Sequence, residues 1–294
     1  MLKTVLTFFA LGACSAPLAA QTPSDARNPL LRHYRTGETL VYRIKGVNEN
    51  WHYEIQADGI VKEDSAGAYF EEYRWSNMLS DNQPDVLSPA SAEFRQRISL
   101  DPNFILKPPN LAQVDPKLIG PVTDLMTFYV DLWLAVKTGQ LVHAGDHLYV
   151  KNGTPSSWAD GAHVLKGESA VDFDITLKAL DHADNSATLA VRHVPPEKSQ
   201  IRMPAAWMEK PVAETPNNWV MVSKTPDGKY IAGVGEETFD VEMKVRLSDG
   251  RILTGSMNNL VKTVMRQCED QALTKCSDPM PHPISRQVEI SLQR

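Results

Sequence analysis

The sequence predicts an α+β protein in which a largely antiparallel, curved meander sheet packs around one long apolar helix at about residues 122–138. Three observations support this fold class. Most of the chain after residue 20 alternates between apolar and polar residues, with the period of two that is typical of half-exposed antiparallel strands. Two Asp-Gly pairs, at Asp227 and Asp249, separate such runs as in β-hairpins with type I′ turns. One stretch, "TDLMTFYVDLWLAVKTG", is apolar around most of its helical circumference.

The first twenty residues have the organisation of an export signal. A positive start with Lys3 precedes the apolar run "TVLTFFALGA" and the small-residue stretch "SAPLAAQ". We expect cleavage after Ala20, which leaves residues 21–294 as a single β-rich domain in the periplasm or outside the cell. The segment "LGAC" supports an alternative, in which Cys14 is acylated and anchors the protein to a membrane. Beyond this region we expect no transmembrane segment.

Composition and charge narrow the class of protein. The 294-residue chain is 42% hydrophobic and 22% charged, which is the balance of a folded globular protein. Its formal charge is −6 and its basic residues form no cluster, so we expect no nucleic-acid partner. The sequence has no phosphate-binding glycine loop and no dinucleotide fingerprint, and we expect no cofactor. The oligomeric state stays open.

Two cysteines remain after the export signal, Cys268 and Cys276 in "CEDQALTKC". In an exported protein such a pair most simply forms a disulfide. Bridged Cα atoms lie about 4.4 to 6.8 Å apart, whereas eight helical steps separate them by about 12 Å, so the segment must turn back on itself. A redox-active pair is the alternative, but the acidic neighbours Glu269 and Asp270 disfavour the thiolate that it needs.

Strand patterns of period two recur along the chain, and each predicts one apolar and one polar face. The clearest are "TLVYRIKG" (39–46), "WHYEIQA" (51–57), "VDFDITLKAL" (171–180), "FDVEMKVRL" (239–247) and "ISRQVEISL" (284–292). In the last of these, Arg286 interrupts the apolar face. Two proline-rich stretches, residues 77–121 and 195–218, predict rim segments rather than central strands.

The predicted helix has Pro121 near its start and Gly139 after its end. At 100° per residue its apolar side chains cover an arc of about 220°, about twice what a helix on a flat sheet needs. We therefore expect it to contact structure on two sides, either a curved sheet or a sheet and the proline-rich segments. Asp124 and Asp131 lie in the remaining polar stripe, which we expect to face solvent, although carboxylates so spaced would also suit a catalytic pair.

Aromatic side chains mark the candidate ligand site. Tyr73 and Trp75 lie on one face of the strand pattern "AYFEEYRW", and Phe128, Tyr129 and Trp133 lie on the apolar arc of the helix. One interpretation is an apolar cavity between helix and sheet with these five residues in its wall. It predicts a non-enzymatic protein that binds a lipid, an acyl chain or another apolar small molecule. The other interpretation is a packed core, in a structural or protein-interaction module of the cell envelope.

Signals of hydrolytic or metal chemistry are weak. His143, Asp146 and His147 lie close together in "LVHAGDHLYV", but the Gly-Asp pair between the histidines indicates a turn rather than the helix face of a metal motif. Ser169 in "GESAV" begins like a nucleophile elbow, yet Val171 replaces its final glycine and a strand pattern follows. We expect no catalytic residue and no metal site, and a hydrolase or metal enzyme is the third interpretation.

Three segments resemble parts of uncharacterised exported bacterial proteins: "GETLVYRIKG", "IGPVTDLMTFYVDLWLA" and "SMNNLVKTVMRQCEDQALTKC". The resemblance covers most of the chain after the signal and implies export without a particular activity. In architecture alone, an antiparallel sheet curved over one apolar helix is similar to the half-open barrels of bacterial lipoprotein carriers. That similarity carries none of their site residues over to this chain.

Overall fold

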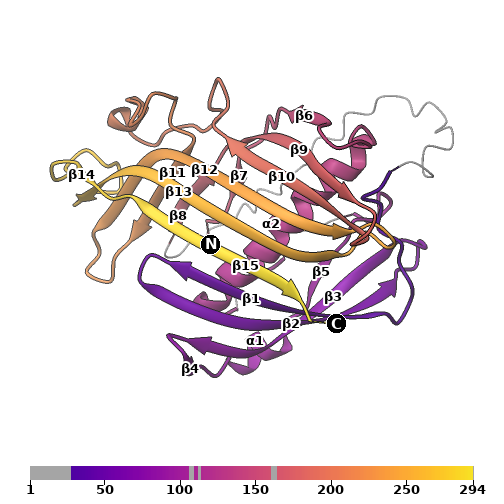
Figure 1. Cartoon of the computed structure of the whole chain (residues 1–294). Coiled ribbons are helices and arrows are strands. Elements are labelled where there is room, and N and C mark those ends of the chain that lie inside the picture. Colours follow the sequence, from indigo (N-terminus) through magenta and orange to yellow (C-terminus); the bar gives the residue numbers. More distant parts are fainter. Residues whose placement is uncertain (1–27, 106–108, 112–113, 160–163, 294) are drawn as a thin grey trace.

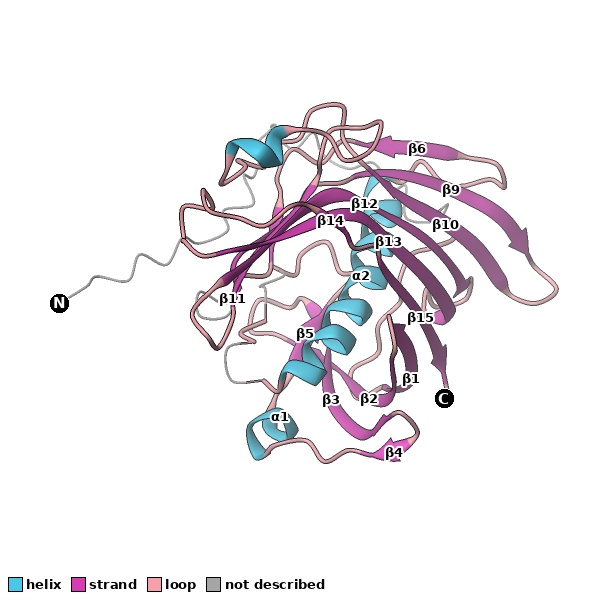
Figure 2. Cartoon of the chain, turned by 90° about the vertical axis from the view of Figure 1, so that its left-hand side faces the viewer, coloured by secondary structure: helices cyan, strands magenta, loops and turns pink. Residues whose placement is uncertain are grey.

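A curled, open antiparallel sheet with one long helix on its concave face makes up most of the molecule (Figures 1 and 2). The structure, a computed structural model, describes residues 28–105, 109–111, 114–159 and 164–293. The predicted export signal, its expected cleavage point and Cys14 lie outside these residues. The main features of the predicted fold class are confirmed: the sheet is antiparallel and curved, and a long helix, α2 (Pro116–Thr138), packs against it.

The strand order across the sheet is β4-β3-β2-β1-β15-β13-β12-β10-β9-β6. These strands are β1 (Thr39–Asn48), β2 (Trp51–Glu63), β3 (Tyr69–Ser80), β4 (Gln83–Pro84), β6 (His147–Val150), β9 (Asp172–Asp181), β10 (Ser186–Val194), β12 (Tyr230–Arg246), β13 (Ile252–Cys268) and β15 (Ile284–Leu292). Beside this series lie β5 (Gln96–Ile98), β7 (Ser156–Ser157), β8 (Val164–Ser169), β11 (Trp219–Lys224) and β14 (Met280–Pro281), with the short helices α1 (Pro89–Glu93) and η2 (Ala206–Glu209).

The meander is interrupted at one place. β1, β2 and β3 are consecutive neighbours, as predicted, but β15 returns from the end of the chain and inserts between β1 and β13. Its register against β1 runs from Tyr42 opposite Leu292 to Asn48 opposite Arg286. The first and last strands therefore join the two halves of the sheet.

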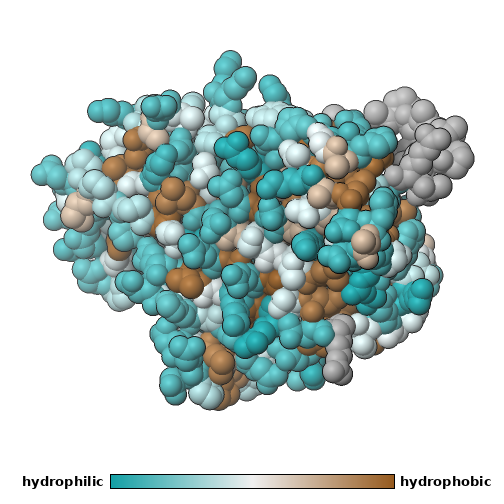
Figure 3. Space-filling model, viewed as in Figure 1, coloured by the Kyte–Doolittle hydropathy of each residue, from teal (hydrophilic) through white to brown (hydrophobic). Residues whose placement is uncertain are grey.

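The predicted alternation is confirmed along the central strands. In β1 the side chains of Leu40, Tyr42 and Ile44 are buried, and in β15 those of Val288 and Ile290 are buried. The opposite, convex face is largely hydrophilic (Figure 3). This is the face expected to meet water in an antiparallel sheet that is covered on one side only.

The hairpin positions are confirmed, but the expected type I′ turns are not. Gly228 and Gly250 have φ of +84° and +69°, whereas the preceding residues Asp227 and Asp249 do not have positive φ. A type I′ turn needs positive φ at both central residues. The connections here span residues 225–229 and 247–251, and a longer connection requires the left-handed conformation only at its glycine.

Helix α2 begins several residues before the predicted start. Asp115 is its N-cap, Pro116 occupies the first helical turn, and Pro121 lies inside the helix. The error arose because both prolines satisfy the rule for a helix start, and the sequence alone does not choose between them. The predicted end is confirmed, since Gly139 adopts φ +61° and its N–H donates to the carbonyl of Val136.

The helix also satisfies the length and composition of a membrane span, although no such span was predicted. More than half of the most apolar stretch of α2 is buried within the protein. A core helix of a folded domain meets the same criteria, so these properties do not place α2 in a membrane.

A second, smaller hydrophobic cluster lies beside the main core. It includes Val220 of β11, Val234 of β12 and Met208 of η2. Cys268 and Cys276 belong to the same region, with their Cα atoms 4.0 Å apart and an S–S distance of 2.04 Å. The chain turns back between them, as predicted, and the pair is compatible with an oxidising compartment.

Candidate functional site

Four of the five aromatic residues predicted to line a ligand site are buried in the main core. Tyr73 and Trp75 of β3 are 0% and 2% exposed, and Phe128 and Tyr129 of α2 are 0% and 3% exposed. Trp133 is partly buried on the outward side of α2, where the ammonium of Lys137 lies 4.4 Å from its ring centroid. The first four side chains therefore fill the space between helix and sheet, while Trp133 packs against the outside of the same core.

Phe128 packs closely on the centre of the sheet because β13 has a glycine beneath it. A Cβ atom added at Gly255 would lie 2.7 Å from Cε1 of Phe128, which is too close for unstrained packing. This contact accounts for the absence of a side chain at that position. It also shows that the helix rests directly on the sheet at this point.

Tyr73 and Tyr129 meet at a buried carboxylate. Their hydroxyl oxygens are 2.8 Å apart, and both hydroxyls donate to Oε2 of Glu71. Burial, followed by the charge of Glu71, raises the pKa of both phenols well above the ordinary value of 10. Oε1 of Glu71 accepts a hydrogen bond of 3.0 Å from Nε of Arg32. This arrangement keeps both tyrosines neutral. The bond from Tyr129 to Glu71 also links α2 to β3.

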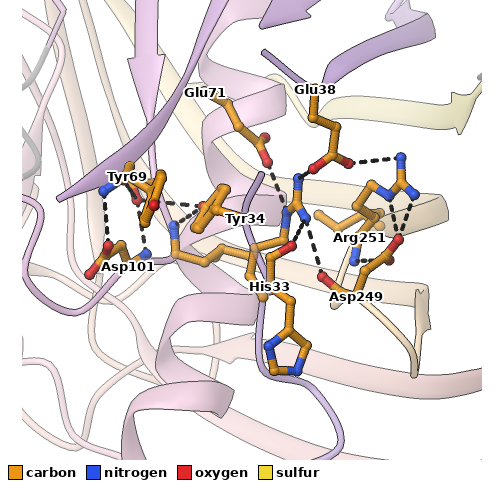
Figure 4. A network of polar contacts seen from close by, with 12 residues as sticks. His33, Tyr34, Glu38, Tyr69, Glu71, Asp101, Asp249 and Arg251 are labelled. Atoms are coloured by element: carbon orange, nitrogen blue, oxygen red, sulfur yellow. Dashed lines mark hydrogen bonds and ion pairs between the residues drawn. The ribbon is translucent and has the colours of Figure 1, made fainter. Parts of the chain in front are cut away.

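The polar network continues to the β12–β13 hairpin (Figure 4). Arg32 also pairs with Glu38 at 3.1 Å, and Glu38 pairs with Arg251 at 2.9 Å. Arg251 in turn contacts Asp249 at 2.5 Å. The network joins the segment before β1 to a hairpin near the other end of the chain. Its two most deeply buried members, Arg32 and Glu71, pair with each other, as buried charges require.

The two helix aspartates are buried, so the prediction of a solvent-facing stripe was wrong. Asp124 and Asp131 are both 0% exposed. Oδ1 of Asp124 lies 2.9 Å from Nη1 of Arg286, and Tyr53 donates its hydroxyl proton to Oδ2. The outward side of α2 instead carries uncharged, partly buried side chains such as Met126 and Val130. The aspartates face inward because the sheet supplies their partners.

Asp131 pairs with a histidine that is enclosed by aromatic rings. Nε2 of His193 lies 2.8 Å from Oδ1 of Asp131, and the imidazole lies 4.8 Å from the ring of Phe173 and 4.7 Å from that of Phe239. Oδ2 of Asp131 has no hydrogen-bond partner among the described residues. Burial raises the pKa of Asp131 above its ordinary value, against the opposing effect of His193.

Ser169 is not arranged as a nucleophile. Its hydroxyl donates to Oε2 of Glu237, and the other carboxylate oxygen of Glu237 accepts from Asn259 at 3.2 Å. Burial raises the pKa of Glu237. No histidine is recorded as a partner of Ser169 within the described chain, and a strand follows it as the sequence predicted. The serine therefore serves a buried hydrogen-bond network.

His143, Asp146 and His147 lie at the predicted turn before β6. Oδ2 of Asp146 accepts from the backbone N–H groups of Val142 and His143, at 2.8 and 2.7 Å. Both bonds lower the pKa of Asp146, and the bond from the His143 N–H has the larger effect. His147 pairs with Asp174 at 2.5 Å on the exposed face of the sheet. Within the described ranges, no group of three or more metal-ligating side chains occurs.

A hollow of about 610 Å³ lies where β3 reaches the edge of the sheet, beside one of the predicted aromatic residues. Trp75 lines it together with Met78, Leu87 and Ala92, and the charged residues at its rim are Arg74, Asp85, Glu93 and Arg95. Residues of helix α1 and of the loop after β4 also line the hollow. This site is closest to the predicted apolar cavity, but it lies at the sheet edge rather than beneath α2.

The loop that covers the hollow is fastened to the start of α2. Asp115 accepts from the N–H of Ser88 at 2.8 Å, and Lys117 contacts the carboxylate of Asp85. Between these contacts Val86 is 86% exposed. A second hollow of about 560 Å³ on the other side of the same loop is lined by Val86, Leu87, Asp115 and Lys117. The exposed side chain of Val86 thus lies between two surface hollows and lines both.

The sequence predicts little of this site. The prolines of residues 77–121 indicate a rim segment, and among the lining residues only Trp75 was predicted, not Leu87, Ala92 or Arg95. One local pattern does indicate part of the site. In "DVLSPAS" two large apolar residues come directly before a serine N-cap and a proline. The contact of that segment with β3 is long-range and has no signature in a single sequence.

No protein-family model, curated protein or solved structure matches this chain. The fold and the site alone define its class: an open antiparallel sheet curled over one helix, with an apolar hollow at one sheet edge.

Proposed function

We propose that this protein is an exported, non-enzymatic binding protein of the cell envelope, and that the hollow beside Trp75 receives an apolar small molecule such as a lipid or an acyl chain. The observation that carries the proposal is the hollow itself. Its volume falls within the range of about 300 to 1,000 Å³ that small-molecule sites occupy, and Trp75, Met78 and Leu87 give it an apolar lining.

Export supports an envelope role, and it rests on the signal-like first twenty residues together with the cysteine pair. The acylated form anchored through Cys14 is the alternative placement. Either form presents the described domain to an aqueous compartment adjacent to lipid. A binding site for apolar molecules is useful there because such molecules need shelter from water to move between membranes.

A structural or protein-interaction module without ligand is the second candidate. The observation that favours it is the dense packing of Tyr73, Phe128 and Tyr129, which leaves these predicted ligand residues buried by the protein's own atoms. In this case the hollow beside Trp75 is only a surface irregularity of the sheet edge.

Filling the hollow separates the two candidates. Ala92 is exposed on α1 and lines the hollow, so Ala92→Trp should occupy that space without disturbing the core. We expect wild-type protein to bind the neutral fluorescent probe N-phenyl-1-naphthylamine, and Ala92→Trp to weaken binding about tenfold or more. The matched control is Ala183→Trp, in the exposed turn between β9 and β10, which should bind as wild type does.

The same proposal predicts the content of native material. Mass spectrometry of organic extracts from protein purified out of its own envelope should identify a lipid or acyl compound that is depleted in Ala92→Trp. If wild-type protein binds no probe and carries no extractable apolar compound, the structural module is the better account.

A further inference from the structure

We infer that the hollow beside Trp75 is selective for an amphiphile with an anionic headgroup, a carboxylate or a phosphate, rather than for a neutral apolar molecule. This inference rests on the proposed function, because it names the ligand class for that site. It follows from three kinds of donor around one apolar hollow: a buried indole N–H, two exposed guanidinium groups and an open strand edge.

The first donor is the indole of Trp75. The residue is 2% exposed, yet its Nε1 has no hydrogen-bond partner among the described residues. A buried N–H without an acceptor costs roughly 1 to 3 kcal/mol, so such groups are rare in folded proteins. Trp75 lines the hollow, but its Nε1 is closed to solvent, so a shift of the indole ring must bring this N–H to an oxygen of a bound ligand.

The second donors are Arg74 and Arg95 at the rim. Their side chains are 60% and 37% exposed, and their nearest carboxylates, on Asp58 and Glu93, are each 3.8 Å away, close to the limit of an ion pair. Nη1 of Arg95 also donates to the carbonyls of Ala92 and Phe94, which holds this guanidinium beside α1. Both cations therefore retain donors for a ligand anion.

The acidic residues of the rim do not cancel this preference. Asp85 is already engaged by Lys117 and by the hydroxyl of Ser80. The Glu93 side chain is 84% exposed, and among the described residues its ion pair is the long contact with Arg95. A ligand anion can replace that weak pairing without leaving a buried charge alone.

The third feature is a gap along the edge of β3. β5 pairs with β3 as far as Tyr73, and β4 pairs with it only from Leu79. Between these points β3 has a strand partner only on its β2 side within the described chain, apart from the bond from Asp85 N–H to the carbonyl of Met78. In an edge strand alternate backbone groups face outward, so this gap adds polar groups beside the apolar lining.

A chain-matched series of ligands tests the inference. Dodecanoate, dodecyl phosphate, dodecanol and dodecyltrimethylammonium share one alkyl chain and differ in the headgroup. We expect the two anions to displace N-phenyl-1-naphthylamine at concentrations about tenfold lower than dodecanol does, and the cation to be the weakest competitor, since hydrogen bonds to charged groups supply that discrimination.

Arginine variants test which side chains produce the preference for anionic headgroups. Arg95→Gln and Arg74→Gln should each reduce the advantage of dodecanoate over dodecanol severalfold. The matched control is Arg97→Gln in β5, two residues further along the chain than Arg95 but paired with Glu72 outside the hollow, and it should retain the full advantage.

The outcomes separate the inference from the proposed function. If dodecanol competes as well as dodecanoate and Ala92→Trp blocks both, the site binds apolar molecules and the headgroup inference is overturned. If Ala92→Trp blocks nothing, both the proposed function and this inference fail. If a short peptide with a free C-terminal carboxylate competes better than every alkyl anion, the open strand edge selects peptides and the amphiphile class is wrong.

Discussion

Buried carboxylates are the residues that most distinguish this protein from an ordinary sheet with an apolar core. Asp124, Asp131 and Glu237 are at most 7% exposed, and in each case burial raises the pKa above its ordinary value. The opposing contributions come from Arg286, His193, or nearby hydroxyl and amide groups. Because these residues have ordinary pKa values in the unfolded chain, their ionisation makes stability depend on pH.

Asp131→Asn should change the pH dependence of folding. The folded pKa of Asp131 is raised, so its contribution to stability is fully present below the ordinary value of 3.8 and is lost as pH rises through the folded value. The variant cannot ionise at this position, and its amide oxygen can still accept from His193. We therefore expect the free energy of unfolding of wild type to fall relative to Asp131→Asn as pH rises above 3.8. Urea unfolding across this range measures the difference.

Asp146→Asn is the control, because the pKa of Asp146 is shifted in the opposite direction to that of Asp131. Asp146 is on an exposed turn, and the backbone N–H groups of His143 and Val142 lower its pKa. Its contribution is present above 3.8 and is lost as pH falls through the lower folded value, so Asp146→Asn should cost stability at neutral pH and progressively less in acid. Parallel pH profiles for wild type and Asp131→Asn would contradict the assignment of a perturbed carboxyl at position 131.

At the scale of elements, α2 shows how local signals set the ends of a helix. Pro116 occupies its first turn, Pro121 lies further in, and Gly139 closes it with a left-handed residue. Gly120 lies within the helix directly before Pro121, and an added Cβ there would meet no atom within 4 Å apart from its chain neighbours and the adjacent helix backbone. The two glycines therefore differ: Gly139 needs positive φ, whereas Gly120 has ordinary helical geometry beside a proline ring.

Alanine at these two glycines should give effects of different size. Gly139→Ala forces a β-carbon into the left-handed region and should lower the free energy of unfolding by about 1 kcal/mol. Gly120→Ala should change it by less, because the gain in helix propensity is opposed by contact between the added Cβ and the Cδ of Pro121. Denaturant titrations of both variants provide the measurement. Equal losses in the two variants would contradict this account.

At the scale of the whole molecule, contacts between distant segments close the helix onto the sheet. Arg286 comes from β15, which joins the two halves of the sheet, and its partner Asp124 comes from the middle of the chain. Tyr129 reaches Glu71 of β3, and Asp131 reaches His193 of β10. These three polar contacts fix the position of α2 on a surface that is otherwise apolar and therefore not directional.

Breaking the Arg286–Asp124 pair should be costly in a non-additive way. Arg286→Leu leaves a buried carboxylate without its cation and should lower the free energy of unfolding by about 3 to 5 kcal/mol. In the double variant Arg286→Leu, Asp124→Asn, the uncompensated charge is gone, so much of this loss should be recovered. A double-mutant cycle from urea titrations measures the coupling. Additive effects of the two substitutions would show that the pair does not act as a buried unit.

The sequence by itself determined the clearest alternating strands, the approximate place of the helix and the partner of each late cysteine. Alternation between neighbouring residues sets the faces of β1 and β15, and the pairing of Cys268 with Cys276 follows because no other cysteine remains after the predicted signal. Arg286 broke the alternation of its strand, but its partner was not visible.

Only the tertiary structure decided which side of α2 faces the sheet, which strands flank β15 and where a hollow forms. A charged residue is placed inside or outside according to whether a distant segment supplies its counter-charge, as Arg286 does for Asp124 and His193 for Asp131. The hollow beside Trp75 likewise arises where α1 and the preceding loop approach an unpaired stretch of β3. Such approaches depend on the path of the whole chain, and no local period encodes them.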